Sequence, residues 1–255
     1  MVFELRGVRG GAVGPPTEGF EVAYRDPCGS ELRRPLTDVW AVRFEDAAPV
    51  REFHSYKGQR HLPGLWWSST AGRHVGYESW LERDHVMLLD FDPLVVGVSS
   101  QPFWLFWTGS NGKGVSHAPD YFARRDDGSA IVIDCRPADR RKPRDLMKFE
   151  ATQSACDLLG WEFRLVGAPD PIRLVNVRWL AGYRHPRHPR HRQEAPAAAL
   201  REVFHEPWPL IDGACLVGDP IAVLPVLFHL LWRNELSVEL SVPLHARSLV
   251  HPGVR

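Results

Sequence analysis

Residues 117–136 read HAPDYFARRDDGSAIVIDCR, and this stretch decides the fold. Its centre, Asp126-Asp127-Gly128, is a strong β-hairpin signal because an Asp-Gly pair readily adopts the left-handed backbone of a tight turn. The flanking segments 117–124 and 129–136 fit two short strands. The stretch therefore predicts a pair of neighbouring antiparallel strands.

The two strands carry one acidic residue each, Asp120 and Asp134. Since side chains alternate between the faces of a strand, Arg136 projects from the same side as Asp134. Hard cations such as Mg²⁺ take oxygen ligands, activate water and offset charge on a phosphorane. We therefore expect Asp120 and Asp134 to hold Mg²⁺ (or Mn²⁺), the backbone carbonyl of Cys135 to be a further ligand, and Arg136 to hold a phosphate oxygen or orient water.

The elements around this hairpin predict an α/β fold. Apolar residues at helical spacing run from Tyr77 to Phe91, where Pro93 ends the pattern, and again over 145–160, where Gly160 ends it. Residues 94–107 fit one or two strands, and 161–166 fit another. The order helix, strand, strand, strand, helix, strand predicts a mixed sheet flanked by helices.

The first of these helices supplies a third acidic group. Glu78 and Glu82 are four residues apart, so on a helix they share one face. We expect Glu82 to complete the carboxylate set as a catalytic residue and metal ligand, with Glu78 as its substitute.

The rest of the chain divides by composition. Strand-like alternation over 20–24 and 39–44 predicts a β-rich N-terminal segment. Helical spacing over 197–205 and 220–232, with a strand at 236–242, predicts a small C-terminal module. The expected units are a β-rich segment (1–75), the α/β core (76–183), a basic Pro-rich linker (184–196) and the helical module (197–255).

Charge is balanced overall, with 31 Lys and Arg against 31 Asp and Glu, so net charge does not indicate a nucleic-acid binder. Two runs are locally basic, 136–148 and 184–192. A solvated basic face is one explanation for each run, and contact with DNA phosphates is the other. The candidates for DNA contact are Arg140, Arg141, Lys142, Arg184, Arg187 and Arg190.

Other site types are not supported. The four cysteines are scattered and form no CxxC pair, which argues against structural zinc and a disulfide framework. No apolar run approaches the roughly 18 residues of a membrane helix, and the N-terminus lacks a secretion signal. We expect a cytoplasmic protein that does not associate with a membrane.

The pattern E…PD…DxR resembles the PD-(D/E)xK nuclease core. More specifically, Glu78–Asp84 (ESWLERD), Leu89–Pro93 (LDFDP), Gln101-Pro102 and His117–Tyr121 (HAPDY) resemble TnsA-like endonuclease subunits of heteromeric transposases. The similarity runs from about residue 47 to 182, and the C-terminal helices are similar to that family's winged-helix-like domain. The resemblance implies a restriction-endonuclease-like core that nicks double-stranded DNA at transposon ends beside a DDE-type transposase and an AAA+ ATPase.

One position departs from the family pattern, which ends in Lys where this chain has Arg136. Arg stays protonated and cannot act as a base, although it can hold a phosphate. Lys148 is a substitute for the missing Lys, and Gln101 is a candidate to orient a catalytic group. Two alternatives therefore remain: a catalytically degenerate DNA-binding or scaffold homologue, and a stand-alone restriction or defence nuclease.

Structural roles compete with these functional ones. Asp120 and Asp134 could each cap a turn, and Glu82 could be an ordinary helical Glu. His117 fits a hydrogen-bonded strand histidine better than a DNA contact. The pair Trp66-Trp67 fits core packing better than base stacking.

Overall fold

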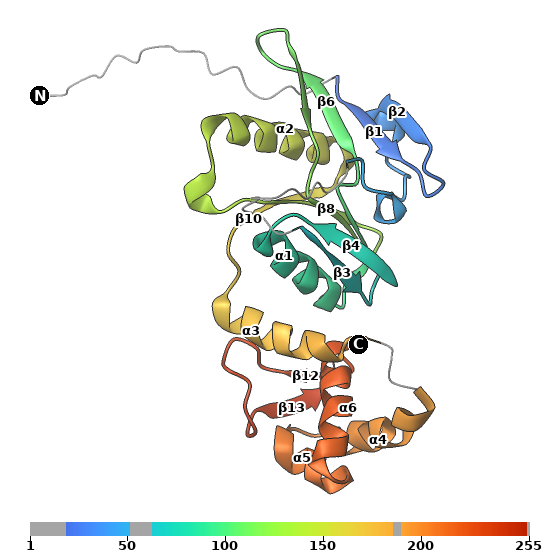
Figure 1. Cartoon of the computed structure of the whole chain (residues 1–255), viewed down its shortest axis with the longest axis vertical. Coiled ribbons are helices and arrows are strands. Elements are labelled where there is room, and N and C mark those ends of the chain that lie inside the picture. Colours follow the sequence, from blue (N-terminus) through green and yellow to red (C-terminus); the bar gives the residue numbers. More distant parts are fainter. Residues whose placement is uncertain (1–18, 52–62, 186–189, 254–255) are drawn as a thin grey trace, which may run out of the picture.

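The structure is a computed structural model that describes residues 19–51, 63–185 and 190–253. Figure 1 shows two lobes, an upper one that contains β1 to β10 with helices α1 and α2, and a lower one that contains helices α3 to α6 and a small sheet with β12 and β13. The chain is of mixed α/β class, as the sequence predicted.

A four-stranded mixed sheet forms the centre of the upper lobe. Its order is β10-β9-β8-β5, with antiparallel β5–β8 and β8–β9 pairs and a parallel β9–β10 pair. The predicted hairpin is present, with Tyr121 opposite Ile133. The strands are β5 (Val95–Ser100), β8 (Tyr121–Arg125), β9 (Ala130–Cys135) and β10 (Glu162–Val166).

Helices cover both faces of this sheet. Ile131 and Ile133 of β9 pack with Val86 and Leu89 of α1 (Trp80–Phe91) on one face. Phe122, Val132 and α2 (Pro143–Leu159) pack on the other. The alternation predicted for the second hairpin strand is therefore confirmed. The predicted order of elements holds for the central sheet and its two helices, but two further strands, β6 and β7, lie between β5 and β8 and belong to another sheet.

A second sheet also lies on the α2 side, in the order β2-β1-β6-β7. Its strands are β1 (Glu21–Arg25), β2 (Glu31–Pro35), β6 (Trp104–Thr108) and β7 (Gly114–His117). The predicted strand 117–124 is thus split, because the chain passes from β7 in this sheet to β8 in the central sheet at residues 118–120.

The strand predicted over 39–44 is wrong. Residues 36–46 form two short 3-10 turns, η1 (Leu36–Asp38) and η2 (Phe44–Asp46). Leu36, Val39 and Phe44 are buried from these turns while Trp40 is 71% exposed. The alternating pattern therefore arises from an irregular segment in which every few residues one side chain is buried, and residues 39–44 form no strand.

The hairpin of β3 (Gly64–Ser68) and β4 (Arg73–Tyr77) was not predicted, and Asp90 fixes it to α1. The buried Asp90 carboxylate accepts bonds from Trp66 Nε1 (2.9 Å), Ser68 Oγ (2.8 Å), Thr70 N (2.8 Å), and both N and Oγ of Ser69 (3.1 and 3.2 Å). Trp66 therefore has a structural role, as the competing interpretation held.

The lower lobe has the order α4, β11, α5, α6, β12, β13, with the three strands in the sheet order β11-β13-β12. These elements follow α3 (Pro171–Leu180) and η4 (Ala181–Tyr183), neither of which was predicted. Their bounds are α4 (Arg190–Val203), β11 (Trp208–Pro209), α5 (Leu210–Val217), α6 (Pro220–Trp232), β12 (Leu236–Val238) and β13 (Leu249–Pro252).

Helix α4 corrects the predicted linker. It begins at Arg190, so residues 190–196 are helical although Pro196 lies inside the helix. Ala197, Leu200 and Phe204 are buried in the core of the lower lobe, and this packing outweighs the helix-breaking tendency of the proline.

The two lobes share helix α1. Its Met87 and Phe91 belong to the core of the lower lobe, whereas Val86 and Leu89 belong to that of the upper lobe. Hydrogen bonds from Trp232 Nε1 to Ser69 Oγ (3.0 Å) and from Asn234 Nδ2 to Phe91 O (3.0 Å) add to this packing.

In the part of the chain that is described, no single helix has the length and apolar character needed to cross a membrane. Helices α5 and α6 meet that test only when taken together, and they are bent by 118° at the break between them.

Replacing Asp90 tests how strongly it fixes the hairpin. Asp90→Asn turns one acceptor oxygen into a donor that faces other donors. We expect the free energy of unfolding to fall by about 1.5–3 kcal/mol, the range for bonds to a charged group, in urea titrations. Asp92→Asn is the control: Oδ1 of Asp92 accepts a bond from Leu94 N, so a change within about 0.5 kcal/mol is expected. Equal losses in the two variants would contradict this role for Asp90.

Candidate functional site

Asp120 lies where the chain enters β8. Its Oδ2 accepts a hydrogen bond from the Cys135 N–H at 2.7 Å, so the carboxyl is held against the end of β9. Its backbone carbonyl accepts the Gln101 N–H at 2.9 Å. The Asp120 carboxyl is thereby fixed between the ends of three strands, β5, β8 and β9.

Asp134 is 2% exposed near the end of β9. Both of its carboxylate oxygens lie 2.9 Å from His117 Nε2, and the His117 ring packs edge-on against Phe149 of α2. The expectation of a hydrogen-bonded strand histidine is confirmed.

Glu82 caps the start of α1. Ser79 is the N-cap residue, Glu82 Oε1 accepts from Ser79 Oγ at 2.7 Å, and Glu82 Oε2 accepts from Glu78 N at 2.7 Å. The expectation that Glu78 shares a helix face with Glu82 is wrong, because the helix begins at Trp80. Glu78 instead pairs with Arg51 at 2.6 Å.

The carboxyl groups of Asp120, Asp134 and Glu82 interact through their charges. Burial raises the pKa of Asp120 well above its ordinary value, and the charges of Asp134 and Glu82 raise it further. Burial also raises the pKa of Glu82, with a smaller rise from the charge of Glu78. The negative charge of Asp134 therefore acts on Asp120, and it makes ionisation of the Asp120 carboxyl less favourable.

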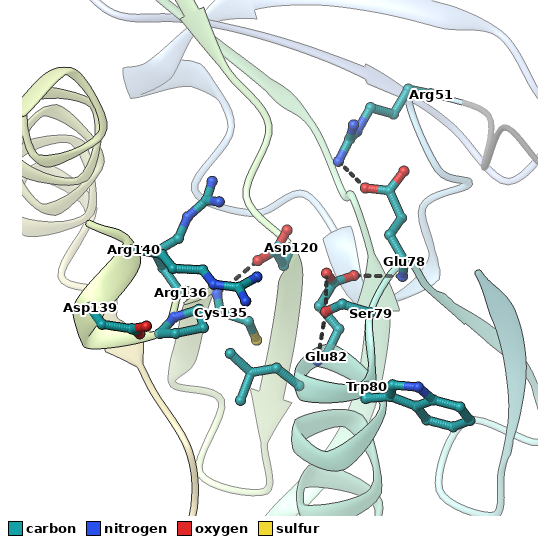
Figure 2. A pocket seen from close by; sticks show the side chains of 12 residues that line it. Arg51, Glu78, Ser79, Trp80, Glu82, Asp120, Cys135, Arg136, Asp139 and Arg140 are labelled. Carbon is teal, nitrogen blue, oxygen red and sulfur yellow. Dashed lines mark hydrogen bonds and ion pairs between the residues drawn. The ribbon is translucent and has the colours of Figure 1, made fainter. Parts of the chain in front are cut away.

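Two cavities meet at Asp120. The larger, of about 620 Å³, is also lined by Glu82, Arg136 and Arg140. The smaller, of about 220 Å³, is lined by Asp134, His117, Arg136 and Lys148. Arg51, Asp120, Cys135 and Arg136 line both. Figure 2 shows Asp120 between Cys135 and Arg136 on one side and Glu82 and Glu78 on the other.

The predicted cations are thus at the site. Arg136 and Lys148 both face the cavity that contains Asp134, so the substitute named for the missing Lys lies beside the carboxylates. Gln101 does not line either cavity; its buried side chain contacts Arg51.

The basic run after β9 surrounds a further hollow of about 370 Å³ next to the larger cavity. The two hollows share Arg136, Asp139 and Arg140. The N-terminal end of α2 adds the positive end of its dipole. Cations outnumber carboxylates in this lining: Arg136, Arg140, Arg141, Lys142 and Arg144 against Asp139 and Asp145.

The basic residues of the predicted linker are placed differently. Arg184 is used within the chain: it donates to Trp67 O at 2.9 Å, and its guanidinium lies 3.8 Å from the centre of the Trp66 ring. Arg187 and the side chain of Arg190 lie outside the described residues.

The carboxylates at the site are of the oxygen-donor type that a hard divalent cation takes. Asp120, Asp134 and Glu82 offer carboxylate oxygens, and a cation would offset the burial and the neighbouring negative charges that raise the pKa of Asp120. No described residue donates a hydrogen bond to Asp120 Oδ1. Within the described residues, however, no three His, Cys, Asp or Glu side chains form a ready-made ligand group. Asp134 and Glu82 would have to exchange their present bonds to His117, Ser79 and Glu78 for bonds to metal.

Sequence reasoning missed Arg51 and the cap formed by Ser79. The cap had a signal, since Ser-x-x-Glu before an apolar helix is a capping-box pattern. Arg51 had none, because long-range folding alone brings it to the site.

No model of a known protein family matches the chain, and no curated protein matches it either.

The charge on Asp120 should make stability depend on pH. Asp120→Asn keeps an oxygen for the Cys135 N–H but cannot ionise. Because the folded-state pKa of Asp120 is raised, the wild-type protein loses stability as pH rises from about 4, the unfolded value, toward the folded value. We therefore expect the variant to be the more stable protein at pH 7, by a margin that closes below about pH 4.

The measurement is urea unfolding across this pH range in EDTA. Asp126→Asn, at the exposed turn of the same hairpin, is the control and should not show the same pH-dependent gain. If the difference in free energy of unfolding between Asp120→Asn and the wild-type protein stayed constant with pH, the raised pKa of Asp120 would be contradicted.

Proposed function

We propose that the chain is a metal-dependent endonuclease that hydrolyses phosphodiester bonds in double-stranded DNA. The observation that carries the proposal is a single cavity lined by Asp120, which immediately precedes β8, and by Asp134 of β9, together with Arg136 and Lys148. Acidic side chains on the floor of a cavity with cations at its rim suit a hard cation together with a phosphate.

The arrangement of elements supports the same proposal. A helix, three antiparallel strands, a helix and a parallel fourth strand correspond to the restriction-endonuclease-like core that the sequence resembles. The lower lobe has the helix, strand, helix, helix, strand, strand order of a winged-helix module. With the motifs in 78–121, this favours an endonuclease subunit of a TnsA-like transposition system. A DDE-type transposase and an AAA+ ATPase would be its partners and the cytoplasm its location.

The proposed reaction is hydrolysis. A water oxygen forms a bond to phosphorus, the bond from phosphorus to the leaving sugar oxygen breaks, a proton leaves the water, and the leaving oxygen gains one. Bound Mg²⁺ or Mn²⁺, held by Asp120, Asp134 and Glu82 with the Cys135 carbonyl as a further ligand, would acidify water and offset the charge on the phosphate. Arg136 and Lys148 stabilise the negative charge that grows on the phosphate oxygens.

DNA contact is proposed for the basic hollow beside the site rather than for the lower lobe. Arg140, Arg141 and Lys142 continue the positive rim from Arg136. In helix-turn-helix modules the second helix enters the major groove. The corresponding helix here is α6, which begins Pro220-Ile221-Ala222-Val223 and exposes Ile221 to 84%. This apolar surface is unsuited to phosphates.

The metal-site residues are tested by nicking of supercoiled plasmid with Mg²⁺. We expect wild-type protein to nick, and Asp134→Ala and Asp120→Ala to fall to the level measured in EDTA, because the hard ligands are lost. Asp126→Ala, on the same hairpin, is the control and should nick normally. Binding without nicking, unchanged by Asp134→Ala, would favour the degenerate scaffold. A transposase and an ATPase encoded beside this chain would favour the transposition system over a stand-alone restriction or defence nuclease.

Lys148 is tested separately. If it stabilises charge on the phosphate, Lys148→Gln should lower the nicking rate by about 10²–10³, the effect of removing one donor to a developing charge, and leave the Mg²⁺ requirement unchanged. Lys113→Gln, at the exposed end of the β6–β7 hairpin, is the matched control. A Lys148→Gln protein as fast as wild type would rule out this role for Lys148.

A further inference from the structure

Arg51 lies across the site from Arg136 and Arg140 (Figure 2). It lines both cavities, and Nη2 pairs with Glu78 Oε2 at 2.6 Å. Its charge offsets part of the rise in pKa of Asp120 and Glu82. Arg51 is therefore a cation of the site, on the rim opposite the basic hollow.

Gln101 holds this guanidinium. With its amide oxygen turned toward Arg51, the side chain accepts from Nε at 3.2 Å and from Nη2 at 3.1 Å, and it donates to the Arg51 carbonyl at 3.2 Å. The Gln101 amide therefore forms hydrogen bonds with both the backbone carbonyl and the guanidinium of Arg51.

Gln101 also ties Arg51 to Asp120. It is 1% exposed and has a φ of +46°, in the left-handed region that side chains rarely adopt. Its backbone N–H donates to the Asp120 carbonyl at 2.9 Å, and its carbonyl accepts the Val50 N–H at 3.0 Å. This strained, buried residue keeps Arg51 in a fixed position relative to the Asp120 carboxyl.

The guanidinium retains capacity to bind a ligand. Gln101 and Glu78 occupy Nε and Nη2, and no described residue accepts a hydrogen bond from Nη1. The side chain is 38% exposed. Charge balance alone would explain one cation beside three carboxylates. It would not require that Gln101 and Glu78 hold the Arg51 guanidinium on two sides while Nη1 stays available, and this arrangement suits the binding of an anion.

We propose that Arg51 binds a backbone phosphate of the DNA strand that crosses the two cavities, and that Gln101 positions it. The inference rests on the proposed function, since it assigns a phosphodiester backbone to the same site. The strand is then held on both sides of the carboxylates, by Arg51 on one rim and by Arg136 and Arg140 on the other.

The test measures binding of a fluorescently labelled duplex of mixed sequence, in EDTA, over a range of KCl concentrations. Each phosphate contact contributes about 0.9 to the slope of log K against log salt. We expect Arg51→Gln to lower the magnitude of this slope by about 0.9, and Arg51→Lys to keep it.

Arg25→Gln is the matched control. Arg25 is 36% exposed and pairs with Glu31 at 2.8 Å, much as Arg51 pairs with Glu78, but it lies on β1 and lines neither cavity. Its slope should equal that of the wild-type protein. Thermal unfolding of each variant checks that the fold is retained.

Gln101→Gly tests the positioning role, because glycine accepts the positive φ while removing the amide. The charge remains, so the slope should be kept while affinity at fixed salt falls by about 2- to 12-fold, the cost of immobilising one long side chain. In an Arg51→Gln background, Gln101→Gly should have no further effect on affinity. If Gln101 had only a structural role, Gln101→Gly would lower the affinity in both backgrounds.

An Arg51→Gln slope equal to wild type overturns the proposal, and so does an affinity loss from Gln101→Gly that persists without Arg51. If Asp134→Ala abolishes nicking while Arg51→Gln leaves the slope intact, the nuclease function stands and this inference fails. If the slope changes as expected but wild-type protein does not nick with Mg²⁺, the phosphate contact stands and the nuclease function fails.

Discussion

The hydrogen bond from the Cys135 N–H to the Asp120 carboxyl is the constraint on which the site depends. It draws the start of β8 onto the end of β9 and sets Asp120 beside Asp134. Backbone hydrogen bonding and the hydrophobic contacts of the central sheet stabilise the hairpin enough to outweigh the repulsion between the two carboxyls. The unfavourable interaction between the two carboxyls thus lies in a part of the molecule that is otherwise well packed.

Hydrogen bonds within the chain hold the acidic groups in place. Asp134 is oriented by His117, and Glu82 by the cap of α1. These bonds orient the Asp134 and Glu82 carboxyls within the chain, so each side chain has a structural role. The basic groups differ in this respect: Arg136 and Arg140 are exposed, whereas Arg51 is anchored through Gln101. The site therefore has a preorganised cation on one side, Arg51, and exposed, more adaptable cations on the other, Arg136 and Arg140.

What the sequence predicted well was local. The Asp-Gly turn specifies a hairpin, and Asp120 and Asp134 at its open end line one cavity, so the centre of the site follows from 20 consecutive residues, 117–136. Gly160 likewise marks the end of α2 through its left-handed backbone. Failures came where tertiary packing decides: Val39 and Phe44 are buried from turns, and α4 runs through Pro196 because its neighbours are buried. Arg51 reaches the site only through contacts far apart in the chain.

The β6–β7 excursion between β5 and β8 has a practical consequence. The Gln101 N–H to Asp120 carbonyl bond closes this excursion at its base, so the 18 residues between them form a loop whose two ends are fixed at the site. Loop-closure entropy grows only slowly with length, by about 0.6 kcal/mol per doubling. The exposed tip at residues 110–113 is therefore a place where an inserted peptide or a fluorescent label would leave the carboxylates undisturbed.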